Sequence, residues 1–108
     1  MDIQDLRKEN SIIDLFCTLV EIPSPSLGED NVATEILTIL LSNGIEVKKD
    51  GYGNVIARIP ATDPSKKPML LSAHMDVVGD DSPINIILNE EGFIETDKKR
   101  TLGADDKA

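Results

Sequence analysis

Two residues, His74 and Asp76, offer the clearest chemistry in this sequence, because one residue separates them directly after the apolar run PMLLSA. His74 is the only histidine of the chain. Side chains two residues apart in an extended segment point to the same face, so Asp76 can accept a hydrogen bond from one imidazole nitrogen. The other nitrogen then keeps the neutral lone pair that a zinc ion binds. The pair predicts a metal site; the alternative is a surface histidine beside an acidic loop.

A second acidic cluster lies in the stretch TLGADDKA, where Asp105 and Asp106 are adjacent and follow Gly103 closely. Two neighbouring carboxylates can supply oxygen ligands to a cation. The alternative is a turn before a helix, because acidic residues favour helix N-termini. The stretch alone leaves both interpretations open.

Two helices are predicted in the first half of the chain, over residues 10–22 and 29–42. Asn10 or Ser11 can cap the first helix, and Pro23 ends it because proline cannot donate a backbone hydrogen bond. The second helix has apolar residues at helical spacing, and Gly44 stands where a left-handed C-terminal cap belongs.

The second half of the chain predicts strands. Residues 45–50 and 54–60 alternate around the turn DGYG, and residues 84–89 and 92–97 flank a turn at Glu90-Glu91-Gly92, so two hairpins are expected. The apolar run at 68–73 is consistent with a buried central strand, which would place His74 at a carboxyl end, the edge where ligands bind in open sheets. We therefore predict an α/β fold, with helices packed on a mixed β-sheet.

Composition restricts the function classes. The 108 residues suit one small domain, and 40% of them are hydrophobic. A net charge of −9 repels nucleic acid and anionic membranes, so neither is expected as a partner. Cys17, the only cysteine, excludes an intrachain disulfide and fits a cytoplasmic location. Its apolar neighbours indicate a buried thiol.

Four stretches in order along the chain resemble the N-terminal part of the dinuclear zinc peptidases, the family that includes peptidase T, glutamate carboxypeptidase and aminoacylase. They are EIPSPSLGED, DGYGNVIARI, LLSAHMDVV and TLGADDKA. The segment GFIETDKKRTLGADDKA is most similar to the peptidase T branch. The resemblance covers essentially the whole chain.

The resemblance implies a role for three residues. His74 would bind one zinc ion, Asp76 would be the catalytic-site acid that orients His74, and Asp105 would bridge two zinc ions. It further implies a three-layer catalytic domain and the hydrolysis of short peptides, in the manner of a tripeptide aminopeptidase, by a water that two zinc ions activate. A deacylase or carboxypeptidase of the same family is an alternative.

We expect residues 1–108 to form a single partial catalytic domain. The family's Glu-Glu pair, a further acidic ligand, a second histidine and the lid or dimerisation domain are not found in the sequence. With the zinc site incomplete, we expect the 108 residues alone to be inactive, to bind zinc weakly and to self-associate through an exposed apolar sheet face. A non-catalytic binding module is the alternative from another functional class.

Overall fold

The computed structural model describes residues 2–77, 79 and 84–96 of the chain. Three helices come first: α1 (Ile3–Glu9), α2 (Ser11–Glu21) and α3 (Asp30–Ser42). Four short strands follow: β1 (Glu46–Lys49), β2 (Val55–Arg58), β3 (Ile86–Leu88) and β4 (Ile94–Thr96). Helices and strands thus share one chain, with α3 packed on β1 and β2 and α1 on β3, and the predicted α/β class is confirmed.

The first helix, α1, was not predicted. Its N-terminus carries a reciprocal cap, because the side chain of Asp2 accepts from the amide of Asp5 at 2.9 Å while the Asp5 carboxylate accepts from the amide of Asp2. Arg7 then ties α1 to α2: its guanidinium contacts Glu21 and donates to Asp14 at 2.7 Å. The Asp-x-x-Asp spacing before an apolar residue was the sequence signal for this helix.

The two predicted helices, α2 and α3, form within their predicted bounds. Asn10 rather than Ser11 caps α2, accepting from two backbone amides at 3.0 and 3.2 Å. Pro23 follows the C-cap residue Ile22. Gly44 has φ of +73°, the left-handed conformation expected just past the end of α3. Local capping therefore marks the start of α2 and the end of α3, whereas the N-cap residue of α3, Glu29, makes no side-chain capping hydrogen bond.

Both predicted hairpins are present, each as its own two-stranded antiparallel sheet. In β1–β2, Glu46 pairs with Arg58, and in β3–β4, Ile86 pairs with Thr96. The turns are alike: Asp50 in one and Asn89 in the other accept hydrogen bonds from backbone amides two and four residues ahead. Each side chain closes its turn through nearby backbone amides. The turn at Glu90-Glu91-Gly92 was predicted from the sequence, and the role of Asn89 in it was not.

The prediction of a buried central strand at residues 68–73 is wrong. This stretch has no regular secondary structure, and Met69, Leu70 and Leu71 are 84%, 90% and 85% exposed rather than buried. A strand needs a neighbour to satisfy its backbone hydrogen bonds, and in the described part of the chain no strand pairs with this stretch. His74 therefore follows an extended, solvent-facing segment and not a buried sheet edge.

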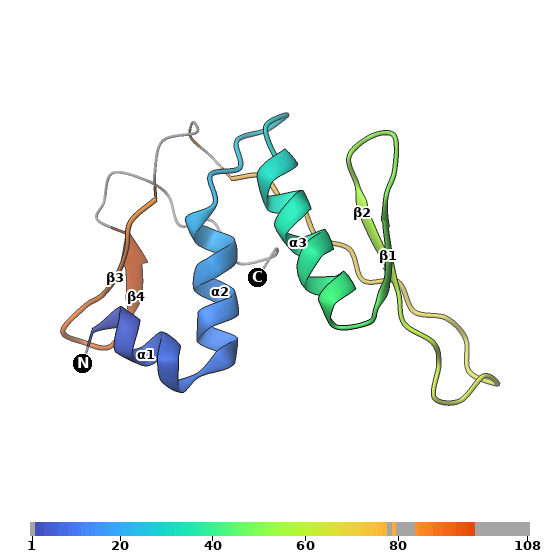
Figure 1. Cartoon of the computed structure of the whole chain (residues 1–108), viewed down its shortest axis with the longest axis horizontal. Helices are drawn as coiled ribbons and strands as arrows, with labels where there is room; N and C mark the ends of the chain where they lie inside the picture. The colour runs from blue at the N-terminus through green and yellow to red at the C-terminus, as the bar shows by residue number, and fades with distance from the viewer. Residues whose placement is uncertain (1, 78, 80–83, 97–108) are drawn as a thin grey trace.

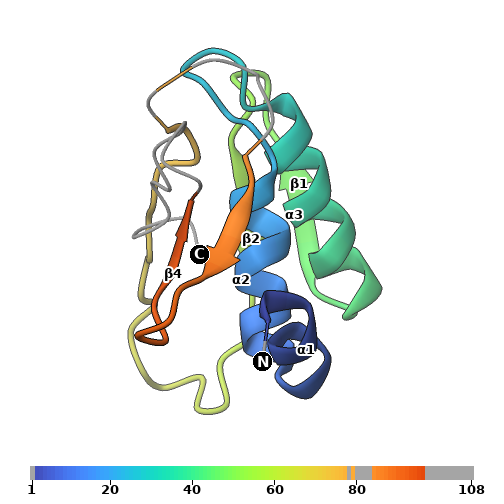
Figure 2. The ribbon, with the colours of Figure 1, turned by 90° about the vertical axis from the view of Figure 1, so that its left-hand side faces the viewer.

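The molecule is elongated, 48 × 32 × 22 Å, because the two hairpins lie at opposite ends (Figure 1). Along the long axis, α2 and α3 lie between the two hairpins (Figure 1), and Figure 2 views the molecule from the β3–β4 end. The described buried apolar side chains are all aliphatic except Cys17 and centre on α2 and α3: Ile3, Cys17, Leu19, Val20, Val32, Ala33, Val77 and Ile84. Burial raises the pKa of the Cys17 thiol, so it packs as a small apolar side chain, as its neighbours predicted.

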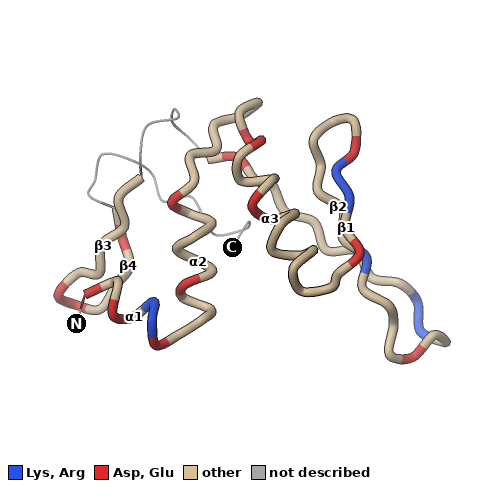
Figure 3. The backbone as a smooth tube through the Cα atoms, in the orientation of Figure 1, with Lys and Arg blue, Asp and Glu red and all other residues tan. Residues whose placement is uncertain are grey.

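Charge is distributed unevenly along the described chain. Basic residues gather in the β1–β2 hairpin and the loop after it, while acidic residues predominate around α1, α2 and the β3–β4 turn (Figure 3). Among the described helices, none combines the length and apolar character that a bilayer-spanning segment requires.

Candidate metal centre

The side chains of His74 and Asp76 are in contact. His74 Nδ1 lies 3.2 Å from Asp76 Oδ1 and 3.0 Å from the Asp76 backbone oxygen. Both side chains are partly exposed, at 53% and 36%. The contact between them is the one that their spacing predicted, and it forms although the segment is not a strand. The metal role of His74 stays a prediction.

The contact selects one tautomer of His74. Two oxygen acceptors face Nδ1, one from a carboxylate and one from a backbone carbonyl. A carboxylate that is ionised has no proton to donate, so the hydrogen must lie on Nδ1. In the neutral ring the lone pair is then on Nε2, which is the nitrogen that a metal ion would use.

The second oxygen of Asp76 is held by Ser26, a residue for which the sequence alone predicted no role. Ser26 Oγ donates to Asp76 Oδ2 at 2.5 Å. This hydrogen bond is the largest cause of the lowered pKa of Asp76, and the nearby imidazole lowers it further. Asp76 is therefore ionised at neutral pH and accepts the hydrogen on His74 Nδ1. The stretch EIPSPSLGED carried the signal for Ser26, because it is one of the four stretches of the family resemblance.

Ser26 sits in a tight turn between α2 and α3. The amide of Gly28 donates to the Pro25 carbonyl at 2.7 Å, which closes the turn. Leu27 lies at its corner with φ of +67°, a left-handed conformation that costs a leucine about 1–2 kcal/mol. Its amide donates to the Glu29 carboxylate at 3.0 Å, which helps to offset this strain. The turn directs the Ser26 hydroxyl toward the Asp76 carboxylate.

A backbone hydrogen bond joins this turn to the histidine segment. The amide of Val77 donates to the carbonyl of Ser24 at 2.8 Å. Ser24 is fully buried and Val77 is 6% exposed. Because the bond is screened from water, it fixes residues 74–77 against the loop that follows α2. The described site is thus built from two segments that lie 50 residues apart in sequence.

The remaining predicted residue, Asp105, lies outside the described residues, as does its neighbour Asp106. Glu90 and Glu91 lie in the turn of the β3–β4 hairpin, where the sequence analysis placed them. Within residues 2–77, 79 and 84–96, no group of three or more histidine, cysteine or acidic side chains gathers. His74, with Asp76 at its Nδ1, would be a single zinc ligand, and the described residues form no larger cluster of such side chains.

Comparison with known proteins gives two relatives. The cytosol non-specific dipeptidase of Escherichia coli is 37% identical over 67 residues, which are 60% of this chain and 14% of the dipeptidase. The uncharacterized protein YqjE of Bacillus subtilis is 29% identical over 108 residues, which are 93% of this chain and 29% of that protein.

No protein-family model and no solved structure matches the chain. The chain spans less than a third of the length of either relative. Its sequence is similar in part to that of a dipeptidase.

Proposed function

We propose that this chain contributes part of the active site of a zinc-dependent exopeptidase that hydrolyses short peptides. The observation that carries the proposal is the contact of His74 Nδ1 with an ionised Asp76, which orients the imidazole as in known zinc sites. The partial similarity to a dipeptidase supports a peptidase, and the name of that relative supports short peptides and a cytosolic location.

Each predicted residue has a defined task under this proposal. Asp76 would hold the proton of His74 on Nδ1, so that Nε2 would be the nitrogen that holds zinc. Asp105, with two carboxylate oxygens, would bridge two ions, as the resemblance to the peptidase T branch implies. Zinc bound there would supply Lewis-acid activation of a water and of the peptide carbonyl. Residues 1–108 would form one partial catalytic domain, and the other ligands and the general base would lie elsewhere in the enzyme.

Zinc titration of the 108-residue chain tests the proposal. We expect calorimetry to show weak binding that falls at least about tenfold in His74→Ala, because the only imidazole ligand is lost. Glu91→Ala, which removes an exposed acid from the β3–β4 turn, is the matched control and should bind as the wild type does.

Equal zinc affinity in wild type and His74→Ala would remove the ligand assignment and favour a binding module without catalysis. We also expect no hydrolysis of dipeptides or tripeptides by the 108 residues alone, even with zinc added. Turnover by this chain would show that its own residues complete the active site.

A further inference from the structure

Both oxygens of the Asp76 carboxylate are engaged, each by a different side chain. Oδ2 accepts from Ser26 Oγ at 2.5 Å, and Oδ1 faces His74 Nδ1 at 3.2 Å. A carboxylate held at one oxygen only can rotate about its Cβ–Cγ bond, which is a soft torsion. The Ser26 hydroxyl removes that freedom and keeps Oδ1 directed at the imidazole.

Backbone hydrogen bonds on both sides of Ser26 fix its position. The Pro25–Gly28 hydrogen bond closes the turn that presents the hydroxyl. The buried Val77–Ser24 hydrogen bond fixes that turn against the segment that carries Asp76. Serine has one rotatable side-chain bond, so little entropy is lost when its hydroxyl donates.

We propose that Ser26 is a positioning residue for the metal centre: it fixes the Asp76 carboxylate and, through it, the Nδ1–H tautomer of His74. The chain of contacts runs from Ser26 to Asp76 to His74 and spans 50 residues of sequence. Its relevance to zinc rests on the proposed function, because only the Nδ1–H tautomer leaves the Nε2 lone pair for a metal.

The tautomer can be measured directly, because His74 is the only histidine of the chain. Imidazole ¹⁵N chemical shifts in alkaline, metal-free buffer distinguish a protonated from an unprotonated ring nitrogen. We expect the wild type to be mainly the Nδ1–H form, and Ser26→Ala to shift His74 towards the Nε2–H form that free histidine favours in water. Ser26→Thr, which keeps the hydroxyl, should restore the wild-type shifts.

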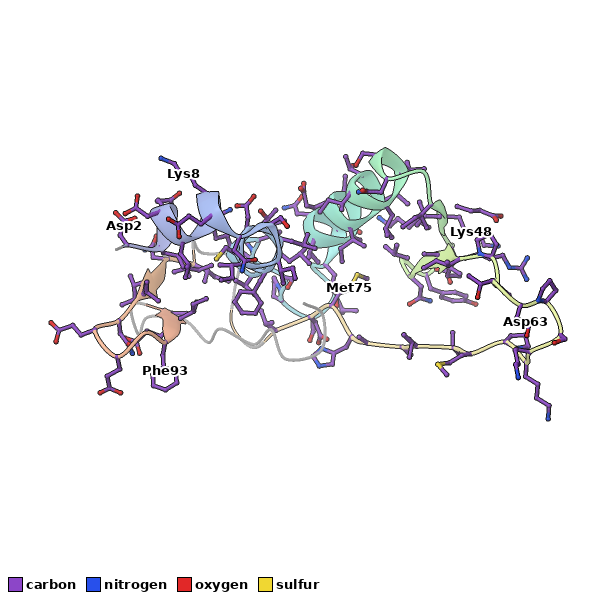
Figure 4. All side chains as sticks on the ribbon, turned by 90° about the horizontal axis from the view of Figure 1, so that it is seen from below. Asp2, Lys8, Lys48, Asp63, Met75 and Phe93 are labelled. Atoms are coloured by element: carbon purple, nitrogen blue, oxygen red, sulfur yellow. The ribbon has the colours of Figure 1, made fainter. Side chains whose placement is uncertain are left out.

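The matched control is Ser65→Ala. Ser65 Oγ also donates to an aspartate, Asp63 Oδ1, at 2.7 Å. Figure 4 shows Asp63 well away from Met75, the residue between His74 and Asp76. Loss of this hydroxyl should leave the His74 shifts unchanged. A wild type that is mainly Nε2–H, or a Ser26→Ala variant with wild-type shifts and a wild-type circular dichroism spectrum, would overturn the proposal.

Zinc affinity separates this inference from the proposed function. If both hold, Ser26→Ala keeps zinc binding but weakens it, by less than His74→Ala does, because Ser26 acts only through Asp76, while Ser65→Ala leaves it unchanged. A tautomer shift in Ser26→Ala together with equal zinc affinity in wild type and His74→Ala would support the positioning role and reject the metal site. Zinc binding that needs His74 but is unaffected by Ser26→Ala would support the site and reject the positioning role.

Discussion

Two serine–aspartate hydrogen bonds in this molecule have the same chemistry and different origins. Ser65 donates to Asp63, two residues before it, inside an exposed turn of the loop that follows β2. Ser26 donates to Asp76, 50 residues away, and links the loop after α2 to the histidine segment. The first pair follows from local sequence, and the second exists only when α2 and residues 74–77 are packed together. Substitutions should therefore have local effects at one pair and distant effects at the other.

The largest difference is expected when the turn that holds Ser26 is distorted. A methyl group added at Gly28 would lie 2.9 Å from Pro25 Cγ and 3.3 Å from the Pro25 carbonyl oxygen. The proline ring cannot swing away, so Gly28→Ala should lower the free energy of unfolding by about 1–3 kcal/mol in urea denaturation. Gly51→Ala, where nothing lies within 4 Å, should change it by less than about 0.5 kcal/mol. Equal losses in both variants would contradict a tight turn at Ser26.

A smaller effect is expected on the backbone that joins the two segments. The Val77 amide is buried and bonded to Ser24, so its hydrogen exchange reports whether residues 74–77 stay attached. Ser26→Ala removes one hydrogen bond between the segments. It should speed the exchange of the Val77 amide about fivefold, because an ordinary hydrogen bond contributes about 1 kcal/mol. Ser65→Ala should not change it. Unchanged exchange in Ser26→Ala would mean that the backbone bond alone holds the segment.

The smallest effect concerns the local pair. Hydrogen bonds from the side chain and amide of Ser65 lower the pKa of Asp63 below its usual 3.8. Because the folded pKa is lowered, the pair stabilises the fold above about pH 3.8 and loses this contribution as the pH falls through the folded value. In Ser65→Ala the pKa of Asp63 should rise towards 3.8, as carboxyl ¹³C shifts followed against pH would show. A pKa that stays low would assign the shift to other groups.

Much of the secondary structure was predictable because its signals are local. Asn10 caps α2, Gly44 ends α3, and Asp50 and Asn89 each fold a hairpin turn through their own neighbouring amides. The error at residues 68–73 has the opposite cause. An apolar run becomes a strand only beside another strand, and within the described residues none lies there. Apolar character alone could not reveal the missing neighbour.

The candidate site divides in the same way. The contact of His74 with Asp76 was predicted from their spacing, because side chains two residues apart on an extended chain lie on the same face. The sequence shows Ser26 as an ordinary loop residue after Pro25, because nothing in its neighbourhood indicates a partner 50 residues away. Asp105 lies outside the described residues and remains a prediction.

The sequence by itself determined the elements whose hydrogen bonds close within a few residues: the caps of α2, the end of α3, both hairpin turns and the imidazole–carboxylate contact. Only the tertiary structure decided that Ser24 and Ser26 meet residues 76 and 77. The physical reason is that such a contact depends on burying α2, α3 and Val77 in one aliphatic core. That burial is a property of the whole packing and of no single stretch of the chain.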